Sequence, residues 1–241
     1  MKPELIADYR CQIGENPLWH PLERCLYWTD ITGGKLFRYD PAAGKHEQCY
    51  QGTLVGGFTI QSDGTLLIPP GSQPGRLYRL DTDGKLDFVL EDIGISNGLG
   101  FTVDRLGFYC TDSLARTIYL FDYEAETGSL SNQPVWLRTP DGAGESDGLT
   151  VDADGYVLSA RWADSALYRY TPEGVEERRI EFPAKKVSSV AFGGDDLTDL
   201  YVTTALLDKD KSTEGQGAGA LFRLRPGIHG LPEYFSNAMI I

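Results

Sequence analysis

The chain repeats a sequence frame with a period of about 41 residues. In each of five segments a small or polar residue is followed by an apolar run and a turn, and the first residues lie 41, 41, 50 and 41 positions apart. These first residues are Glu15, Gly56, Asn97, Asp147 and Ser188. A second landmark, KLFRYD in the first repeat, follows the first residue after 21, 21, 21, 20 and 33 positions. Because four of the five distances agree to within one residue, we interpret the repeat as a structural unit.

A period of about 40 residues with several short strands per unit is typical of a β-propeller. Each repeat can be read as a four-stranded antiparallel blade, with an inner strand such as 99–102 and a second strand such as 107–111. The third strand carries the landmark, and an outer strand such as 88–91 completes the blade. Aspartate–glycine pairs at 63–64 and 154–155 fall where hairpin turns are needed. The sequence therefore predicts an all-β fold.

Five repeats predict five blades within a single domain over residues 1–241. A closed ring leaves no free sheet edge, so we expect the strand at residues 4–9 to complete the last blade. The long third repeat has polar loops at 127–132 and 141–145, and the fifth carries DKDKSTEGQGAG between its second and third strands. We expect these segments to be surface insertions, one of which could cover a channel mouth.

The charge balance narrows the classes of partner. With 22 basic and 35 acidic residues the net charge is −13, which argues against nucleic acid or an anionic membrane as a partner and favours divalent cations near the surface. The sequence has no run of eighteen apolar residues and its start lacks the apolar centre of a signal peptide, so we expect a cytoplasmic protein. The oligomeric state is not predicted.

Cysteine and histidine spacing gives little sign of a soft-metal site. The cysteines have no CxxC spacing, which favours free and mostly buried thiols over redox or catalytic use; they are Cys11, Cys25, Cys49 and Cys110. The three histidines form no zinc-binding pattern.

Several segments together resemble one known family. They are GENPLW at 14–19, ISNGLGF at 95–101, FYCTDS at 108–113 and SDGLTVDADG at 146–155, with SSVAFGG and GALFRL in the last repeat. This set is similar to the gluconolactonase, regucalcin and senescence marker protein family, and it covers nearly the whole chain. The resemblance implies a propeller with a divalent metal in its central channel and hydrolysis of sugar lactones. It also implies that Glu15, Asn97 and Asp147 are the three protein ligands of that metal.

The chain departs from that family in blade number, because the family fold has six blades. The break falls in SDGTLLIPPGSQPGRLYRLD, where residues up to Leu67 resemble the first half of the second family blade. From Pro70 onward the sequence resembles the second half of the third blade. The family has an Asn-Asp-Gly segment between them, whose Asn and a nearby Arg contact substrate or a metal-bound water, and nothing here matches it. The loss predicts a five-bladed ring and puts catalysis in question.

The first residues of the inner strands should meet around the central channel. Two carboxylates and one carboxamide make an oxygen-only set that suits Ca²⁺, Mg²⁺ or Mn²⁺ better than a dedicated zinc site, although Zn²⁺ stays possible. We expect Ca²⁺. The alternative is that Glu15, Asn97 and Asp147 only bond turns at strand starts.

Two functional hypotheses follow. In the first, the metal assists hydrolysis of a small sugar lactone, with Asp147 as metal ligand and general base. Asp30 and Asp112, at equivalent second-strand positions, and Arg161 would contact the substrate, or else form surface or blade-to-blade pairs. In the second, the protein is a metal-binding propeller that lost activity with the missing blade.

A serine-hydrolase pattern also occurs. Residues 144–148, GESDG, fit GxSxG, but that motif requires a strand, a sharp turn and a helix. The following LTVDADGYVLSA favours strand, turn and strand, and no histidine holds a matching position in the repeats. We therefore do not expect Ser146 to be a nucleophile.

Overall fold

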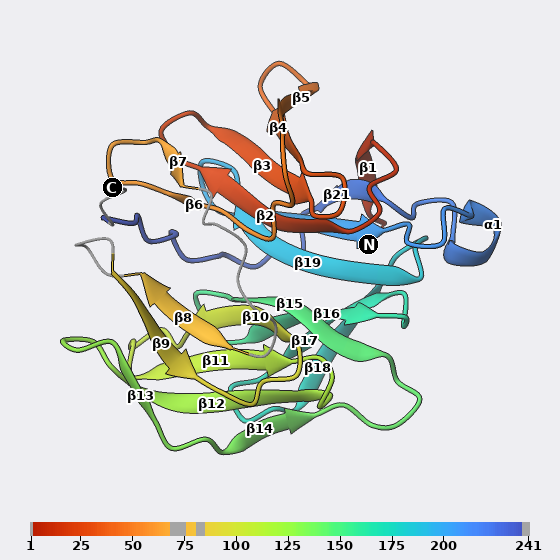
Figure 1. Ribbon diagram of the computed structural model, residues 1–241. Helices are drawn as coiled ribbons and strands as arrows, with labels where there is room; N and C mark the ends of the chain where they lie inside the picture. The colour runs from red at the N-terminus through yellow and green to blue at the C-terminus, as the bar shows by residue number, and fades with distance from the viewer. Residues whose placement is uncertain (1, 68–75, 81–84, 238–241) are drawn as a thin grey trace.

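The computed structural model describes residues 2–67, 76–80 and 85–237 (Figure 1). Regular structure in this part of the chain consists of antiparallel β-sheets and one short helix. Four sheets have at least four strands, and each of these follows chain order from an innermost to an outermost strand, except that the last sheet ends with the N-terminal strand.

The first sheet contains β2 (Gly14–His20), β3 (Cys25–Asp30), β4 (Lys35–Asp40) and β5 (Lys45–Gln51). The next complete sheet contains β10 (Ser96–Phe101), β11 (Gly107–Asp112), β12 (Thr117–Glu124), β13 (Ser129–Ser131) and β14 (Val135–Arg138). It is followed by β15 (Glu145–Val151), β16 (Val157–Trp162), β17 (Ala166–Tyr170) and β18 (Glu176–Glu181). The last sheet contains β19 (Lys186–Gly193), β20 (Asp199–Ala205), β21 (Ala220–Leu224) and β1 (Glu4–Asp8).

The N-terminal strand completes the last sheet, as the sequence predicts. β1 pairs antiparallel with β21, and Glu4 lies opposite Arg223. The guanidinium of Arg223 also donates to Glu4 Oε2 at 2.7 Å. The first and last parts of the chain are thus held in one sheet, which joins the ends of the chain without a covalent link.

Two further sheets have only two strands in the described residues. They are β6 (Thr59–Ile60) with β7 (Leu66–Leu67), and β8 (Leu77–Leu80) with β9 (Leu86–Leu90). Figure 1 shows the first pair beside β2 and β3, and the second pair beside β11 and β12. The sequence break between these pairs includes residues 68–75, which lie outside the described residues, so the prediction of five blades stays a prediction.

The apolar core lies mainly between neighbouring sheets. Leu158 of the third complete sheet packs in one cluster with Val190 and Phe222 of the last sheet. Trp28 and Tyr201 belong to a second cluster, which joins the first sheet to the last. Face-to-face packing of this kind, repeated from sheet to sheet, is the packing of propeller blades.

The insertion in the fifth repeat folds back on the molecule instead of standing free. It contains the helix α1 (Lys211–Glu214), and Glu214 is only 1% exposed. The Glu214 carboxylate forms an ion pair with Lys186 at the start of β19, and the backbone N–H of Lys185 donates to Glu214 O at 2.7 Å. No observation places the insertion over a channel mouth. Three of the four cysteines are buried, and all four are free, as predicted.

Residues 226–237 form a C-terminal strap that runs from the last sheet to distant parts of the fold. Gly230 N donates to Leu197 O at 2.9 Å, and His229 O accepts from Ala153 N at 2.9 Å in the turn between β15 and β16. Further along, the ring of Tyr234 lies edge-on to Phe101 of β10, with centroids 6.0 Å apart. The strap therefore contacts three of the complete sheets.

The strap ends against β6, one of the two short strand pairs. Ser236 N donates to Ile60 O at 2.7 Å, and Ser62 N donates to Ser236 O at 2.8 Å, which gives a parallel bridge to Gln61. All these contacts lie at or beyond the final residues of innermost strands. The strap consequently crosses the end of the molecule opposite to the strand starts that carry Glu15, Asn97 and Asp147.

We predict that Gly230→Ala destabilises the protein, because a Cβ atom at this position of the strap would meet the Phe192 ring. Overpacking of this kind costs about 1–3 kcal/mol, to be measured as the loss in free energy of unfolding in urea. The matched control is Gly56→Ala, where a Cβ meets nothing within 4 Å. Equal stability of the two variants would show that the strap is not packed as described.

Candidate metal site

The innermost strands share an irregularity near their first residues. The register shifts between Glu15 and Leu18 in β2, between Ser96 and Leu99 in β10, and between Ser146 and Leu149 in β15. A corresponding shift occurs in β19, between Val187 and Ser189. In each case the innermost strand has one more residue than its partner, which is a β-bulge. Bulges re-aim side chains, and here they contain or adjoin the three predicted metal ligands.

Neighbouring bulges touch one another. A Cβ on Gly98, next to Asn97, would lie 2.7 Å from Asp147 O and would also meet the Leu149 backbone. A Cβ on Gly148, next to Asp147, would overlap Ser189 of β19. Only glycine allows backbones to approach so closely. These two glycines therefore allow the first residues of β10, β15 and β19 to pack directly against one another.

This packing brings Glu15, Asn97 and Asp147 together. Burial raises the pKa of the Asp147 carboxyl well above its usual range, the nearby Glu15 carboxylate raises that pKa further, and a hydrogen bond with the Asn97 side chain lowers it. Burial also raises the pKa of Glu15 to about 7, against the opposing effect of hydrogen bonds from Asn16 and Ser189. Two carboxylates and one amide thus share a desolvated space, where negative charges repel.

The donor set fits a hard divalent cation. Asp147 is 4% exposed, and its Oδ1 is buried without a hydrogen-bond partner among the described residues. A buried carboxylate oxygen without a donor is costly, and a cation would satisfy it while removing the repulsion from Glu15. In the part of the chain that the structure describes, no three His, Cys, Asp or Glu side chains are grouped for a metal, so a site here requires the Asn97 amide.

Glu15 is held in place by its neighbour Asn16. Asn16 has a positive φ of 48°, which asparagine tolerates better than most residues, and its backbone N–H donates to Glu15 Oε2 at 3.1 Å. Its side chain exchanges two hydrogen bonds of 3.3 Å with the backbone of Phe58, just before β6. Asn16 therefore links the first sheet to the short β6–β7 pair and fixes the turn that presents Glu15.

The structure also corrects which serine of the last repeat lies at the site. The sequence frame places Ser188 in register with the ligands, but the Ser188 hydroxyl donates to Gly14 O and lies 3.1 Å from Thr203 Oγ1 inside the fold. Ser189, one residue later, is the serine beside Glu15. Nothing in the repeat pattern signals this shift by one residue. Asn16 and Ser189 are thus the site residues that sequence reasoning missed.

Asp30 and Asp112, predicted to contact substrate, both bind backbone amides. Asp30 Oδ1 accepts from Ile13 N at 3.1 Å, and Asp112 accepts from Gly94 N at 2.9 Å and Ala115 N at 3.0 Å. Both are almost fully buried. Each carboxylate therefore fixes the loop that leads into the innermost strand of its own sheet.

Arg161 lies inside its sheet. It is 2% exposed, it donates to Tyr170 Oη at 2.6 Å and to Ser146 Oγ, and its guanidinium lies 5.1 Å from the centre of the Tyr168 ring. These contacts place the guanidinium in the packing of its own sheet and give no support to a role in substrate binding.

Ser146 has the environment of a structural residue, not of a nucleophile. It is fully buried, and its hydroxyl lies 2.9 Å from Thr139 Oγ1 in addition to accepting from Arg161. β15 continues through a turn into β16, so the strand–turn–helix geometry of a nucleophile elbow is absent at this position.

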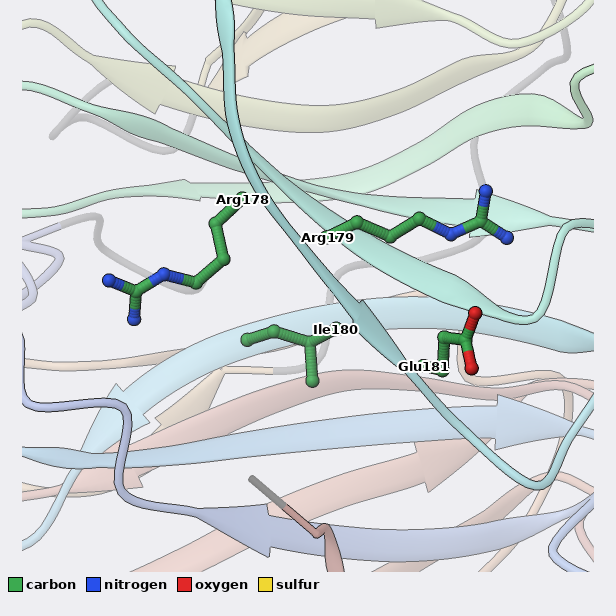
Figure 2. Close-up of a pocket in the computed structure, with 4 residues that line it drawn as sticks. All are labelled: Arg178, Arg179, Ile180 and Glu181. Atoms are coloured by element: carbon green, nitrogen blue, oxygen red, sulfur yellow. The ribbon is translucent and has the colours of Figure 1, made fainter.

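A cavity of about 620 Å³ lies away from these residues, along the outermost strand β18. In Figure 2, Arg178 and Ile180 point to one side of β18, and Arg179 and Glu181 point to the other. This is the alternation of an ordinary strand. The two arginines are engaged with Pro226 O and Asp164 O, so we assign the cavity no catalytic role.

The sequence model of the family described as "SMP-30/Gluconolactonase/LRE-like region" matches residues 13–72 and 67–206. The chain belongs to this family. The two matched segments meet at 67–72, inside the break that the repeat spacing indicates. Together they include all three candidate metal ligands. In the described part of the chain, no helix is long and apolar enough to cross a membrane.

Two curated relatives match this chain over nearly its whole length. Pentonolactonase XacC of Haloferax volcanii is 39% identical over 285 positions, with 98% of each chain covered. The putative sugar lactone lactonase YvrE of Bacillus subtilis is 29% identical, covering 92% of this chain and 94% of that protein. The alignment with XacC spans 285 positions, whereas this chain has 241 residues. This chain therefore has gaps in the alignment that add up to about one repeat.

Solved structures show the fold. A luciferin-regenerating enzyme superposes with a TM-score of 0.84 at 24% identity, covering 95% of this chain and 97% of that one. Regucalcin of Agrobacterium tumefaciens, described as a calcium-binding protein, also gives 0.84, at 22% identity, covering 98% and 97%. The propeller architecture predicted from the repeat is thus confirmed, with the number of complete blades left open.

We predict that the metal-free protein loses stability as the pH rises. Because the pKa of Glu15 is raised from 4.5 to about 7 and that of Asp147 is also raised, the folded state holds more protons than the unfolded state between these values. The free energy of unfolding should therefore fall between about pH 5 and pH 8 by an amount on the order of 1–2 kcal/mol. Asp147→Asn should flatten this dependence, measured by urea denaturation in a chelator.

The control for this measurement is Glu126→Gln, which changes an exposed carboxylate and should keep the wild-type pH dependence. If the wild type gained stability over the same interval, the carboxylates would not be buried against each other as described.

Proposed function

We propose that this protein hydrolyses a sugar lactone, with Glu15, Asn97 and Asp147 binding one divalent cation, Ca²⁺ in the first instance. The observation that carries the proposal is the Oδ1 of Asp147, which is buried and has no hydrogen-bond partner among the described residues, beside a second carboxylate and an amide. The chain that holds it is 39% identical to a pentonolactonase over 98% of its length. Small uncharged sugar lactones also suit a strongly acidic protein, since they are not repelled by it.

Each residue has a distinct role in this proposal. When bound, the cation supplies Lewis-acid chemistry, which polarises an ester carbonyl and makes water near it easier to deprotonate. Glu15 contributes negative charge from β2, and Asn97 contributes a neutral amide oxygen from β10. Asp147 also acts as the general base, through the carboxylate oxygen that does not contact the cation.

The reaction is addition of water to the lactone carbonyl carbon, followed by cleavage of the ring C–O bond. Asp147 takes a proton from the attacking water and returns it to the alkoxide that leaves, so that the product is the open-chain hydroxy acid.

The alternative proposal is a propeller that binds a divalent cation without catalysis. It is favoured by the interrupted family match at 67–72 and by alignment gaps of about one repeat. The missing sequence includes the Asn-Asp-Gly segment that the family resemblance links to substrate contact. The ligands Glu15, Asn97 and Asp147 lie outside the break, so cation binding would survive its loss.

We predict that Asp147→Ala lowers kcat/KM for lactone hydrolysis by about 10²–10⁴-fold, the range of a lost general base. Hydrolysis should be followed by proton release, with pentono- and hexonolactones as substrates and Ca²⁺, Mg²⁺ or Mn²⁺ added after chelator treatment. Chelator alone should abolish activity in the wild type, and added cation should restore it. The control variant Glu126→Ala should retain wild-type kinetics.

Calorimetric titration with Ca²⁺ separates the two proposals. Cation binding together with turnover supports the lactonase, whereas binding without turnover of any lactone supports the non-catalytic propeller. Turnover that persists in a chelator and in Asp147→Ala would contradict both.

A further inference from the structure

The hydroxyl of Ser113 lies between Asn97 and the strand that carries Asp147. Ser113 Oγ donates to Ser146 O at 2.7 Å, because a carbonyl oxygen can only accept. The hydroxyl proton is therefore committed to Ser146. Toward Asn97, Ser113 Oγ can act only as an acceptor, and it accepts from Asn97 Nδ2 at 3.3 Å.

This arrangement determines which way the Asn97 amide faces. If the amide were flipped, its oxygen would face a lone pair of Ser113 Oγ with no proton between them. The NH₂ group must then lie toward Ser113, where it uses one of its two hydrogens, and the carbonyl oxygen Oδ1 must lie on the far side of the amide from Ser113. The second hydrogen is the donor that lowers the pKa of the Asp147 carboxyl, because only a donated hydrogen bond stabilises a carboxylate. A cation requires that oxygen, since the NH₂ group of an amide is not a ligand.

The hydroxyl is not needed for the turn in which Ser113 lies. Ser113 N donates to Ile95 O at 3.0 Å, and the equivalent residue of the first sheet, Ile31, makes the same bond to Ile13 O at 3.0 Å. In each of these sheets an aspartate also accepts a hydrogen bond from the loop before the innermost strand, Asp112 from Ile95 N and Asp30 from Ile13 N. The turn thus forms equally with an isoleucine, so the serine hydroxyl has a task beyond the turn.

We propose that Ser113 is a positioning residue that holds the Asn97 amide with its oxygen available to the cation. This inference rests on the proposed cation site, but not on lactone hydrolysis. Outer residues that orient a metal ligand typically change metal affinity or activity by 10–100-fold when removed. Ser113 is 9% exposed, so solvent has little room to replace its hydroxyl.

The test compares Ser113→Ala with Ser113→Thr, which restores a hydroxyl, and with Thr32→Ala as matched control. The Thr32 hydroxyl, in the corresponding turn of the first sheet, is exposed and donates to Gln12 Oε1 at 2.9 Å. Ser113→Ala should weaken Ca²⁺ binding about 10-fold in calorimetry, whereas Ser113→Thr and Thr32→Ala should stay within about 2-fold of wild type. If the protein hydrolyses lactones, kcat of Ser113→Ala should fall by a larger factor than KM rises.

A second measurement does not depend on the cation. In the metal-free protein, hydrogen exchange of the Asn97 side-chain amide, followed by NMR, should be at least about 10-fold faster in Ser113→Ala than in wild type and in Ser113→Thr. Wild-type exchange and wild-type Ca²⁺ affinity in Ser113→Ala would overturn the inference. If the wild type binds no divalent cation, the proposed function fails. The exchange rate then decides the inference about Ser113, and an unchanged rate in Ser113→Ala overturns it as well.

Discussion

The candidate site depends on one extra residue near the start of four innermost strands. The bulges in β2, β10, β15 and β19 interrupt the ladders at equivalent places and turn polar side chains toward one another. Gly98 and Gly148 then allow the bulged backbones to touch. A regular ladder would send alternate residues to the two faces of each blade, and the carboxylates would pack between blades instead of meeting.

The sequence break lies away from the strands that carry the candidate ligands. The innermost strands β10, β15, β19 and β2 are consecutive neighbours, and all three candidate ligands come from this group. The break lies elsewhere, between β7 and β8, where only strand pairs are described. Across the opposite end, the C-terminal strap bonds to β6 and packs on β10, the innermost strands that flank the break in sequence. Loss of one repeat length is therefore compatible with an intact ligand set.

Much of this could be predicted from the sequence, for a physical reason. Blades bury similar faces against similar neighbours, so the spacing of apolar runs shows both the strands and the equivalence of Glu15, Asn97 and Asp147. Details that depend on contacts between repeats were not predictable. Ser189 lies beside Glu15 in place of Ser188, and Asn16 fixes Glu15 through the backbone of Phe58, 42 residues further along the chain. The pattern also could not show that the guanidinium of Arg161 lies over the rings of Tyr168 and Tyr170.

The central claim is that these three side chains hold one divalent cation, and anomalous diffraction from crystals soaked in Mn²⁺ tests it most directly. The account predicts a single strong peak within coordination distance of Asp147 Oδ1, Glu15 and the Asn97 amide oxygen, and its loss in Asp147→Ala. A protein that hydrolyses lactones while its Mn²⁺ peak lies elsewhere, or is absent, would contradict the account.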